Sequence, residues 1–174
     1  LPLMTGVLFP GMMLTVQIGR PENRALVEEC VSRKREFVAS YAHAEVDTNS
    51  QSPIHQVGVF ARVVDHKEGP GGSMLVTLEG LKRIAITAIL KDEPFLVGTV
   101  MPIEQPSYVL KNIKSRMDAA ISIVGEITHL DPIYSPELSN VLKMNLEDPS
   151  ALADRIAASF HISLQSKQEL LESI

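Results

Sequence analysis

The sequence predicts an α+β protein in which a β-rich domain over residues 1–105 precedes a helical subdomain over residues 106–174. Short runs of β-branched and aliphatic residues, separated by Gly, Pro and polar clusters, fill the first hundred residues. Only one segment there, after Pro21, has helical spacing. Beyond Pro102 and Pro106 the apolar residues recur every three to four positions, which is typical of amphipathic helices.

The composition is that of a globular protein with an aliphatic core. Hydrophobic residues make up 45% of the 174 residues, with five Phe, three Tyr and no Trp, so the core must be aliphatic and rich in Met. The 16 Lys and Arg against 21 Asp and Glu lack the basic excess that phosphate binding requires, so nucleic acid is a poor first candidate. No apolar run reaches the roughly 20 residues that span a bilayer, and a signal peptide is not expected in residues 1–18.

The β-rich domain is expected to begin with a strand, a helix and a second strand. Residues 12–18 form a β-prone run between Pro10-Gly11 and Gly19. Pro21 suits the first turn of a helix over residues 22–35, whose inner face holds Ala25, Leu26, Cys30 and Val31. Residues 36–42 follow as a strand.

Four more strands are expected after a polar loop over residues 45–53. The pattern predicts a hairpin formed by residues 57–64 and 74–78, which are joined by a glycine-rich turn at residues 69–72. Residues 83–90 and 95–101 supply two further short strands. Six short strands and one helix indicate a small barrel or rolled sheet.

The helical subdomain is expected to hold four helices. The first begins near Ser107, and its apolar face comprises Val109, Ile113, Met117, Ala120, Ile121, Val124 and Ile127. A shorter helix covers residues 137–144, and Asp148 can cap a third that starts at Pro149 and buries Leu152, Ile156, Ala157 and Phe160. The last, from Ser163, uses Leu164, Leu170, Leu171 and Ile174 and has no stop signal, which is typical of a cut boundary.

No residue pattern predicts catalysis, a metal site or a cofactor site. The five histidines are not spaced as zinc ligands and are expected on loops or the surface: His43, His55, His66, His129 and His161. Cys30 is expected on the inner face of its helix as a small hydrophobe. The 69–72 glycines lack the Lys-Ser/Thr of a phosphate loop. Arg33, Lys34 and Arg35 could contact phosphate, although a solvated helix end is the commoner role. The chemistry indicates a binding or structural module.

Several collinear segments, which together cover nearly the whole chain, resemble the amino-terminal region of Lon-type ATP-dependent proteases. They are Leu1-Pro2-Leu3, residues 7–12 (VLFPGM), Ile18-Gly19-Arg20, Val57-Gly58-Val59, residues 76–84 (VTLEGLKRI), Asp148-Pro149, residues 152–157 (LADRIA) and residues 167–172 (KQELLE). Most of these residues are architectural, and Gly11, Gly19 and Gly80 are expected at turns that a Cβ would obstruct. The hairpin tip at residues 67–72 and the loop at residues 45–53 depart from the family pattern, so substrate contacts made there cannot be carried over.

The resemblance implies a PUA-like β pseudo-barrel followed by an all-α helical bundle, without catalytic machinery. It also implies a role in capturing unfolded or degron-bearing proteins and in supporting a homohexamer of the parent protease. A cytoplasmic location is expected, with the mitochondrial matrix as the less favoured compartment. Such a receptor needs exposed apolar surface, and Met12, Met13 and Met74 are the candidate substrate-binding residues, unless they fill gaps in the core. Binding of denatured polypeptide is expected to be weak, micromolar or looser.

Two rival interpretations remain open at this point. A stand-alone PUA-like module would bind RNA or a small ligand and should carry a stripe of Lys and Arg, which is not visible in the sequence. A free-standing relative with no protease attached is the second rival, against which the uncapped last helix argues.

Overall fold

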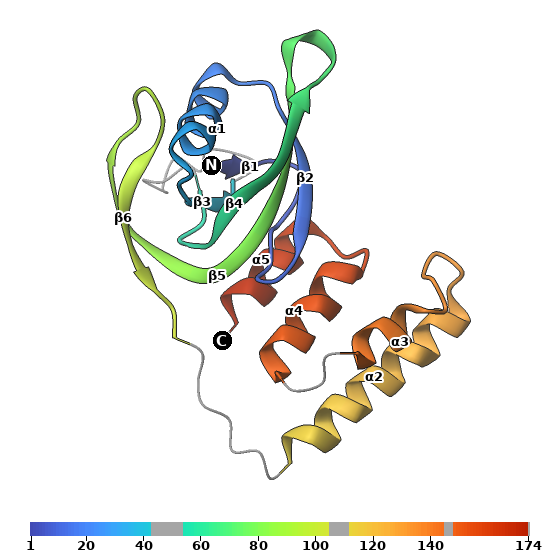
Figure 1. Ribbon diagram of the computed structural model, residues 1–174. Helices are drawn as coiled ribbons and strands as arrows, with labels where there is room; N and C mark the ends of the chain where they lie inside the picture. Colours follow the sequence, from blue (N-terminus) through green and yellow to red (C-terminus); the bar gives the residue numbers. More distant parts are fainter. Residues whose placement is uncertain (43–53, 105–111, 145–147, 174) are drawn as a thin grey trace. The chain divides into compact units, whose positions relative to one another are not determined.

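The computed structural model describes residues 1–42, 54–104, 112–144 and 148–173, which fall into two units (Figure 1). The first unit comprises Leu1–Glu104 together with His161–Ile174, and the second comprises Gln105–Phe160. The described residues form six strands and five α-helices. The α+β class is therefore confirmed, whereas the PUA-like and bundle assignments stay predictions.

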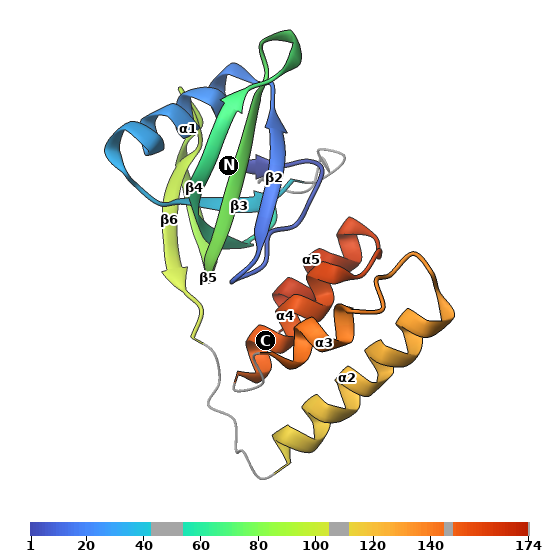
Figure 2. The ribbon, with the colours of Figure 1, turned by 45° about the vertical axis from the view of Figure 1, so that its right-hand side comes forward.

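A six-stranded sheet dominates the first unit (Figure 2). Its strand order is β1-β3-β4-β5-β2, and β6 also pairs with β5. All described pairings are antiparallel except that of β1 with β3. The strands are β1 (Pro2–Leu3), β2 (Met13–Ile18), β3 (Phe37–Tyr41), β4 (Val57–Glu68), β5 (Met74–Lys91) and β6 (Val97–Pro102).

The strands differ from the expected set at two places. β1 was not predicted, because two residues carry no periodic signal. The runs 74–78 and 83–90, expected as separate strands, form one continuous strand of 18 residues, β5. Gly80 lies inside this strand and does not make the expected turn, because β5 keeps pairing with β4 on both sides of it.

Gly80 is where the turn before β2 lies against the sheet. The Met12 amide donates to the Phe9 carbonyl at 3.2 Å, and Gly11 has a φ of +70° after Pro10, which is typical of a type II turn. The Gly11 amide donates to the Gly80 carbonyl at 2.8 Å, and the Gly80 amide donates to the Met12 carbonyl at 2.9 Å. A Cβ on Gly80 would collide with the Phe9 carbonyl oxygen.

The helix α1 (Pro21–Arg33) forms where expected and buries Leu26, Val27 and Cys30. Lys34 ends it in the left-handed region at φ 52°, and its amide donates to the Val31 carbonyl while the Arg35 amide donates to that of Cys30. Gly19, just before α1, has open space at its Cβ position, so the expected need for glycine there is not supported.

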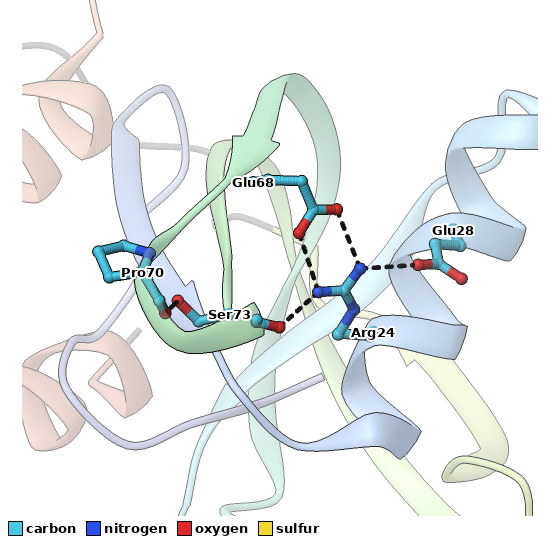
Figure 3. A network of polar contacts seen from close by, with 6 residues as sticks. Arg24, Glu28, Glu68, Pro70 and Ser73 are labelled. Atoms are coloured by element: carbon cyan, nitrogen blue, oxygen red, sulfur yellow. Dashed lines mark hydrogen bonds and ion pairs between the residues drawn. The ribbon is translucent and has the colours of Figure 1, made fainter.

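A polar network joins α1 to the turn of the β4–β5 hairpin (Figure 3). The Arg24 guanidinium donates to both carboxylate oxygens of Glu68, at 3.0 and 3.2 Å, and to the Gly72 carbonyl at 2.6 Å. It also contacts Glu28 at 3.4 Å. Within the turn the Ser73 hydroxyl donates to the Pro70 carbonyl. The 69–72 segment is thus a hairpin turn, as predicted.

The second unit contains α2 (Ile113–Leu130), α3 (Leu138–Lys143) and α4 (Pro149–Ser159). The expected cap is confirmed, since the Asp148 carboxylate accepts from the Ser150 amide at 2.9 Å. The Tyr134 and Phe160 rings meet at 4.9 Å between centroids. The buried core of this unit contains Met117, Ile121, Val124, Leu142 and Leu152.

The helix α5 (Leu164–Glu172) packs on the sheet, and the segment His161–Ile174 belongs to the first unit. Its Gln168 amide donates to the Val57 carbonyl at 3.0 Å, and Arg83 Nε donates to the Leu171 carbonyl at 3.0 Å. Both bonds join α5 to strands distant in sequence, so local periodicity could not reveal them. The expectations for His43, residues 45–53, Ser107, Val109 and Ile174 fall outside the described residues.

Replacing Gly80 by Ala should lower the free energy of unfolding by about 1–3 kcal/mol, because the methyl group forces the 9–12 turn away from β5. Urea denaturation measures the change. Gly19→Ala is the matched control and should have little effect, because nothing lies near its Cβ position. Equal stability of the two variants would contradict the close approach at Gly80.

The Arg24 network should also appear in a pH titration. Hydrogen bonds from Arg24 lower the pKa of Glu68, so the ion pair persists as the pH falls through the ordinary glutamate range and breaks below it. In Arg24→Gln the Glu68 carboxyl should titrate at higher pH, as measured by carboxyl-carbon NMR. Arg33→Gln, which removes only the 2.8 Å pair with Glu29, should leave the lowered pKa in place. A Glu68 titration indifferent to Arg24 would refute the network.

Candidate functional site

An aliphatic cavity of about 270 Å³ opens in the first unit between the β5–β6 pair and the α1–β3 side. Ile86 and Ile89 of β5 and Val97 and Val100 of β6 line one wall. The residues opposite include Leu26 and Val38, and among the described lining residues only Glu36 has an ionisable side chain. The described structure thus contains a concave surface suited to apolar groups.

The residues of β5 and β6 that line the cavity are aliphatic side chains that the core leaves partly uncovered. Ile86 pairs with Val100, and two register shifts follow along the β5–β6 ladder. Ile86, Ile89, Val97 and Val100 are all half-buried, whereas Ile84, earlier in β5, is fully buried. The volume lies just below the roughly 300–1,000 Å³ of small-molecule pockets, so it suits a few aliphatic side chains.

The three predicted substrate-binding methionines do not form one surface. Met13 begins β2 and is 60% exposed, and Met12 beside it is half-buried. Met74 pairs with Ile18 at the other end of β2 and is only 3% exposed, so it fills the core. None of the three lines the aliphatic cavity. The cavity residues were missed because they converge from strands and a helix distant in sequence.

A second cavity, of about 400 Å³, lies between the end of α1 and β4. Its lining contains one acidic side chain, Glu36, and four basic side chains: Lys34, Arg35, Arg62 and His66. Arg62 donates to Glu79 at 2.6 Å, which neutralises its charge and raises the pKa of the guanidinium. The cationic character of this cavity therefore rests mainly on Lys34 and Arg35.

The described side chains include few reactive arrangements. Burial raises the pKa of the Cys30 thiol, which is the opposite of the shift that activates a nucleophile. His55 stacks on Tyr41 with 5.5 Å between ring centroids and contacts Glu172 at 3.1 Å. Among the described residues no group of three or more His, Cys, Asp or Glu is placed to hold a metal ion. No helix in the described ranges is long and apolar enough to cross a membrane.

Comparison with known proteins gives one consistent family. The model of the ATP-dependent protease La (LON) substrate-binding domain matches residues 1–174. The chain is 32% identical over 173 residues to Lon protease 2 of Herpetosiphon aurantiacus, covering 99% of this chain and 21% of that protein. It is 27% identical to the Lon protease of Dictyoglomus thermophilum, covering 100% and 22%. The chain thus spans about a fifth of the length of these relatives.

Solved structures show the same fold at low identity. The N-terminal domain of the Mycobacterium avium complex Lon protease aligns with a TM-score of 0.70 at 19% identity, covering 100% of this chain and 88% of that one. A Lon N-terminal domain protein from Xanthomonas campestris aligns with a TM-score of 0.51 at 19% identity, covering 91% and 95%.

The Cys30 thiol should react slowly with a disulfide reagent at neutral pH, because burial keeps it protonated and shields it. The reaction should accelerate only above the ordinary thiol pKa, since the shift is upward. Ellman's reagent gives the rate, and the chain unfolded in guanidinium supplies the reference for an accessible thiol. A folded chain that reacts at pH 7 as fast as the unfolded one would show an exposed, activated cysteine.

Proposed function

The chain belongs to the substrate-binding domain family of ATP-dependent Lon proteases, and from this premise we propose that it captures unfolded or degron-bearing proteins for degradation. These 174 residues correspond to the substrate-binding part of such proteases and not to the peptidase part. The family match over the whole chain is the observation that carries the proposal.

The aliphatic cavity supports this function physically. Unfolded chains expose aliphatic side chains that folded proteins bury, and transferring them from water is favourable by about 25 cal/mol per Å². Ile86, Ile89, Val97 and Val100 offer half-buried aliphatic surface that such side chains can cover. A receptor of this kind distinguishes unfolded from folded protein without reading a particular sequence.

Met13 and Met12 are kept as a further part of the proposed substrate surface. Met13 is 60% exposed, and a flexible thioether adapts to varied partners. Met74 is left out, because a side chain with 3% exposure cannot contact a substrate in this conformation.

The assembly of the parent protein is part of the proposal. We infer a cytoplasmic protease whose copies form a homohexamer, with this region recognising substrates and helping to hold the copies together. No nucleic acid or membrane is expected to bind here. The PUA-like barrel and helical bundle belong to the same inference.

A stand-alone PUA-like module for RNA or a small ligand is not favoured. Its best support would be the cavity at the end of α1, where Lys34 and Arg35 gather. Glu36 lies in the same lining, and Arg62 is already paired with Glu79. Binding the phosphate backbone of RNA would require more unpaired Lys and Arg side chains than this cavity provides.

Substrate capture is tested by titrating the 174-residue chain with a denatured model protein while recording methyl NMR spectra. We expect dissociation constants in the micromolar range or weaker, with shifts at the Ile86, Ile89, Val97 and Val100 methyl groups. Ile89→Thr should weaken binding about three- to tenfold, because one aliphatic contact is lost. Leu90→Thr is the matched control: Leu90 is the next residue of β5, is 66% exposed and lies outside the cavity.

Two results would count against this proposal. If no surface methyl shifts at saturating denatured protein, the chain does not capture unfolded polypeptide. If Leu90→Thr and Ile89→Thr weaken binding equally, the aliphatic cavity is not where the substrate binds.

A further inference from the structure

β2 has one paired edge and one free edge. It lies at the end of the strand order and pairs with β5 along all six of its residues, from Met13 opposite Glu79 to Ile18 opposite Met74 (Figure 2). No strand among the described residues pairs with its other side. The free edge is therefore as long as the strand itself.

The hydrogen bonds at Gly80 show which backbone groups occupy the free edge. The Gly80 amide donates to the Met12 carbonyl, so the carbonyl of Met12, the residue just before β2, points toward β5. Antiparallel pairing alternates, so Leu14, Val16 and Ile18 also bond to β5. The amides and carbonyls of Met13, Thr15 and Gln17 then point away from the sheet. In the described part of the chain, no backbone hydrogen bond joins these three residues to a neighbour on that side.

This edge lacks the features that usually protect an edge strand. Charged residues, Pro and bulges normally prevent edge strands from pairing with other chains. β2 (MLTVQI) has no charged residue and no Pro, and its register with β5 is unbroken. The other edges differ: β1 is two residues long and contains Pro2, and the ladder of β6 is interrupted by two register shifts.

We propose that the free edge of β2 binds an extended segment of a substrate polypeptide as an added β-strand. Donors and acceptors that repeat every second residue, about 6.8 Å apart, match the backbone of an extended chain. Recognition through the backbone is independent of sequence, and it rejects folded proteins because their backbone groups are already paired. The proposal rests on the proposed function and specifies how the substrate is held.

The side chains of the same three residues suit varied partners. Met13, Thr15 and Gln17 are exposed and uncharged. Thr15 meets Thr77 of β5 through their hydroxyls at 3.1 Å, and the Gln17 amide donates to the Ser73 hydroxyl at 2.9 Å. An added strand would lie beside neutral side chains that repel neither acidic nor basic residues.

A proline at position 15 tests the edge directly. Thr15→Pro removes an outward-pointing amide that does not bond to β5, so the sheet should persist. An added strand would lose one hydrogen bond and would clash with the proline ring. Affinity for a capped synthetic peptide of about ten Val, Leu and Thr residues should fall about fivefold or more. Thr15→Val is the matched control, which loses the same hydroxyl but keeps the amide, so its affinity should fall much less than that of Thr15→Pro. Circular dichroism and thermal unfolding establish that both variants fold.

Changes to the peptide test the same idea on the unaltered chain. A peptide methylated at every second amide keeps one free edge and should bind normally. A peptide methylated at all amides has no donors on either edge, and its affinity should fall about tenfold or more. This comparison decides the matter even if Thr15→Pro fails to fold.

The outcomes separate the edge from the general function. If the unmodified peptide and denatured protein both fail to bind the original chain, both the proposed function and the edge proposal are contradicted. If they bind, but full methylation and Thr15→Pro change nothing, only the edge proposal is overturned. A concentration-dependent dimer that Thr15→Pro abolishes, with peptide affinity unchanged, would also overturn it, because the edge would then serve a second copy of the chain.

Discussion

The continuous pairing of β5 is the constraint on which the first unit depends. This strand pairs with β4 on one side, and β2 and then β6 pair with successive parts of it. Gly80 lies between these two partners, where the absence of a side chain lets the Phe9 carbonyl approach. The turn that docks there sets the register of β2 on β5, and that register decides which backbone groups of β2 face away from the sheet.

The elements that follow local rules could be predicted from the sequence. Helix α1 was expected from Pro21 and an apolar face, and Asp148 was recognised as a cap because both signals lie within a few residues. Gly80 was misassigned to a turn, since a glycine beside polar residues resembles a break. Its role is a close approach by Phe9, which is far away in sequence. The packing of α5 on the sheet was missed for the same reason.

The candidate site was predicted less well than the fold. Met74 was a candidate for the substrate surface, with a place in the core as the alternative, and the structure shows Met74, Val76 and Leu78 alternating along β5 and all facing the core. That period-two pattern was visible in the sequence and could have excluded Met74. The cavity around Ile89 could not be located in this way, because its walls come from elements separated by tens of residues. The signal that was present is the excess of aliphatic residues in β5 and β6.

Under the proposed function, these features make up a receptor that works by geometry and apolar surface. In this proposal the aliphatic cavity accepts side chains of the substrate, and the edge of β2 presents backbone groups to it. Hydrogen exchange at single-amide resolution, with and without saturating denatured protein, tests this account most directly. It predicts new protection at the amides of Met13, Thr15 and Gln17, with little change at Leu14, Val16 and Ile18, which β5 already protects. Unchanged exchange rates at the β2 amides, with slower exchange of amides elsewhere in the chain, would contradict it.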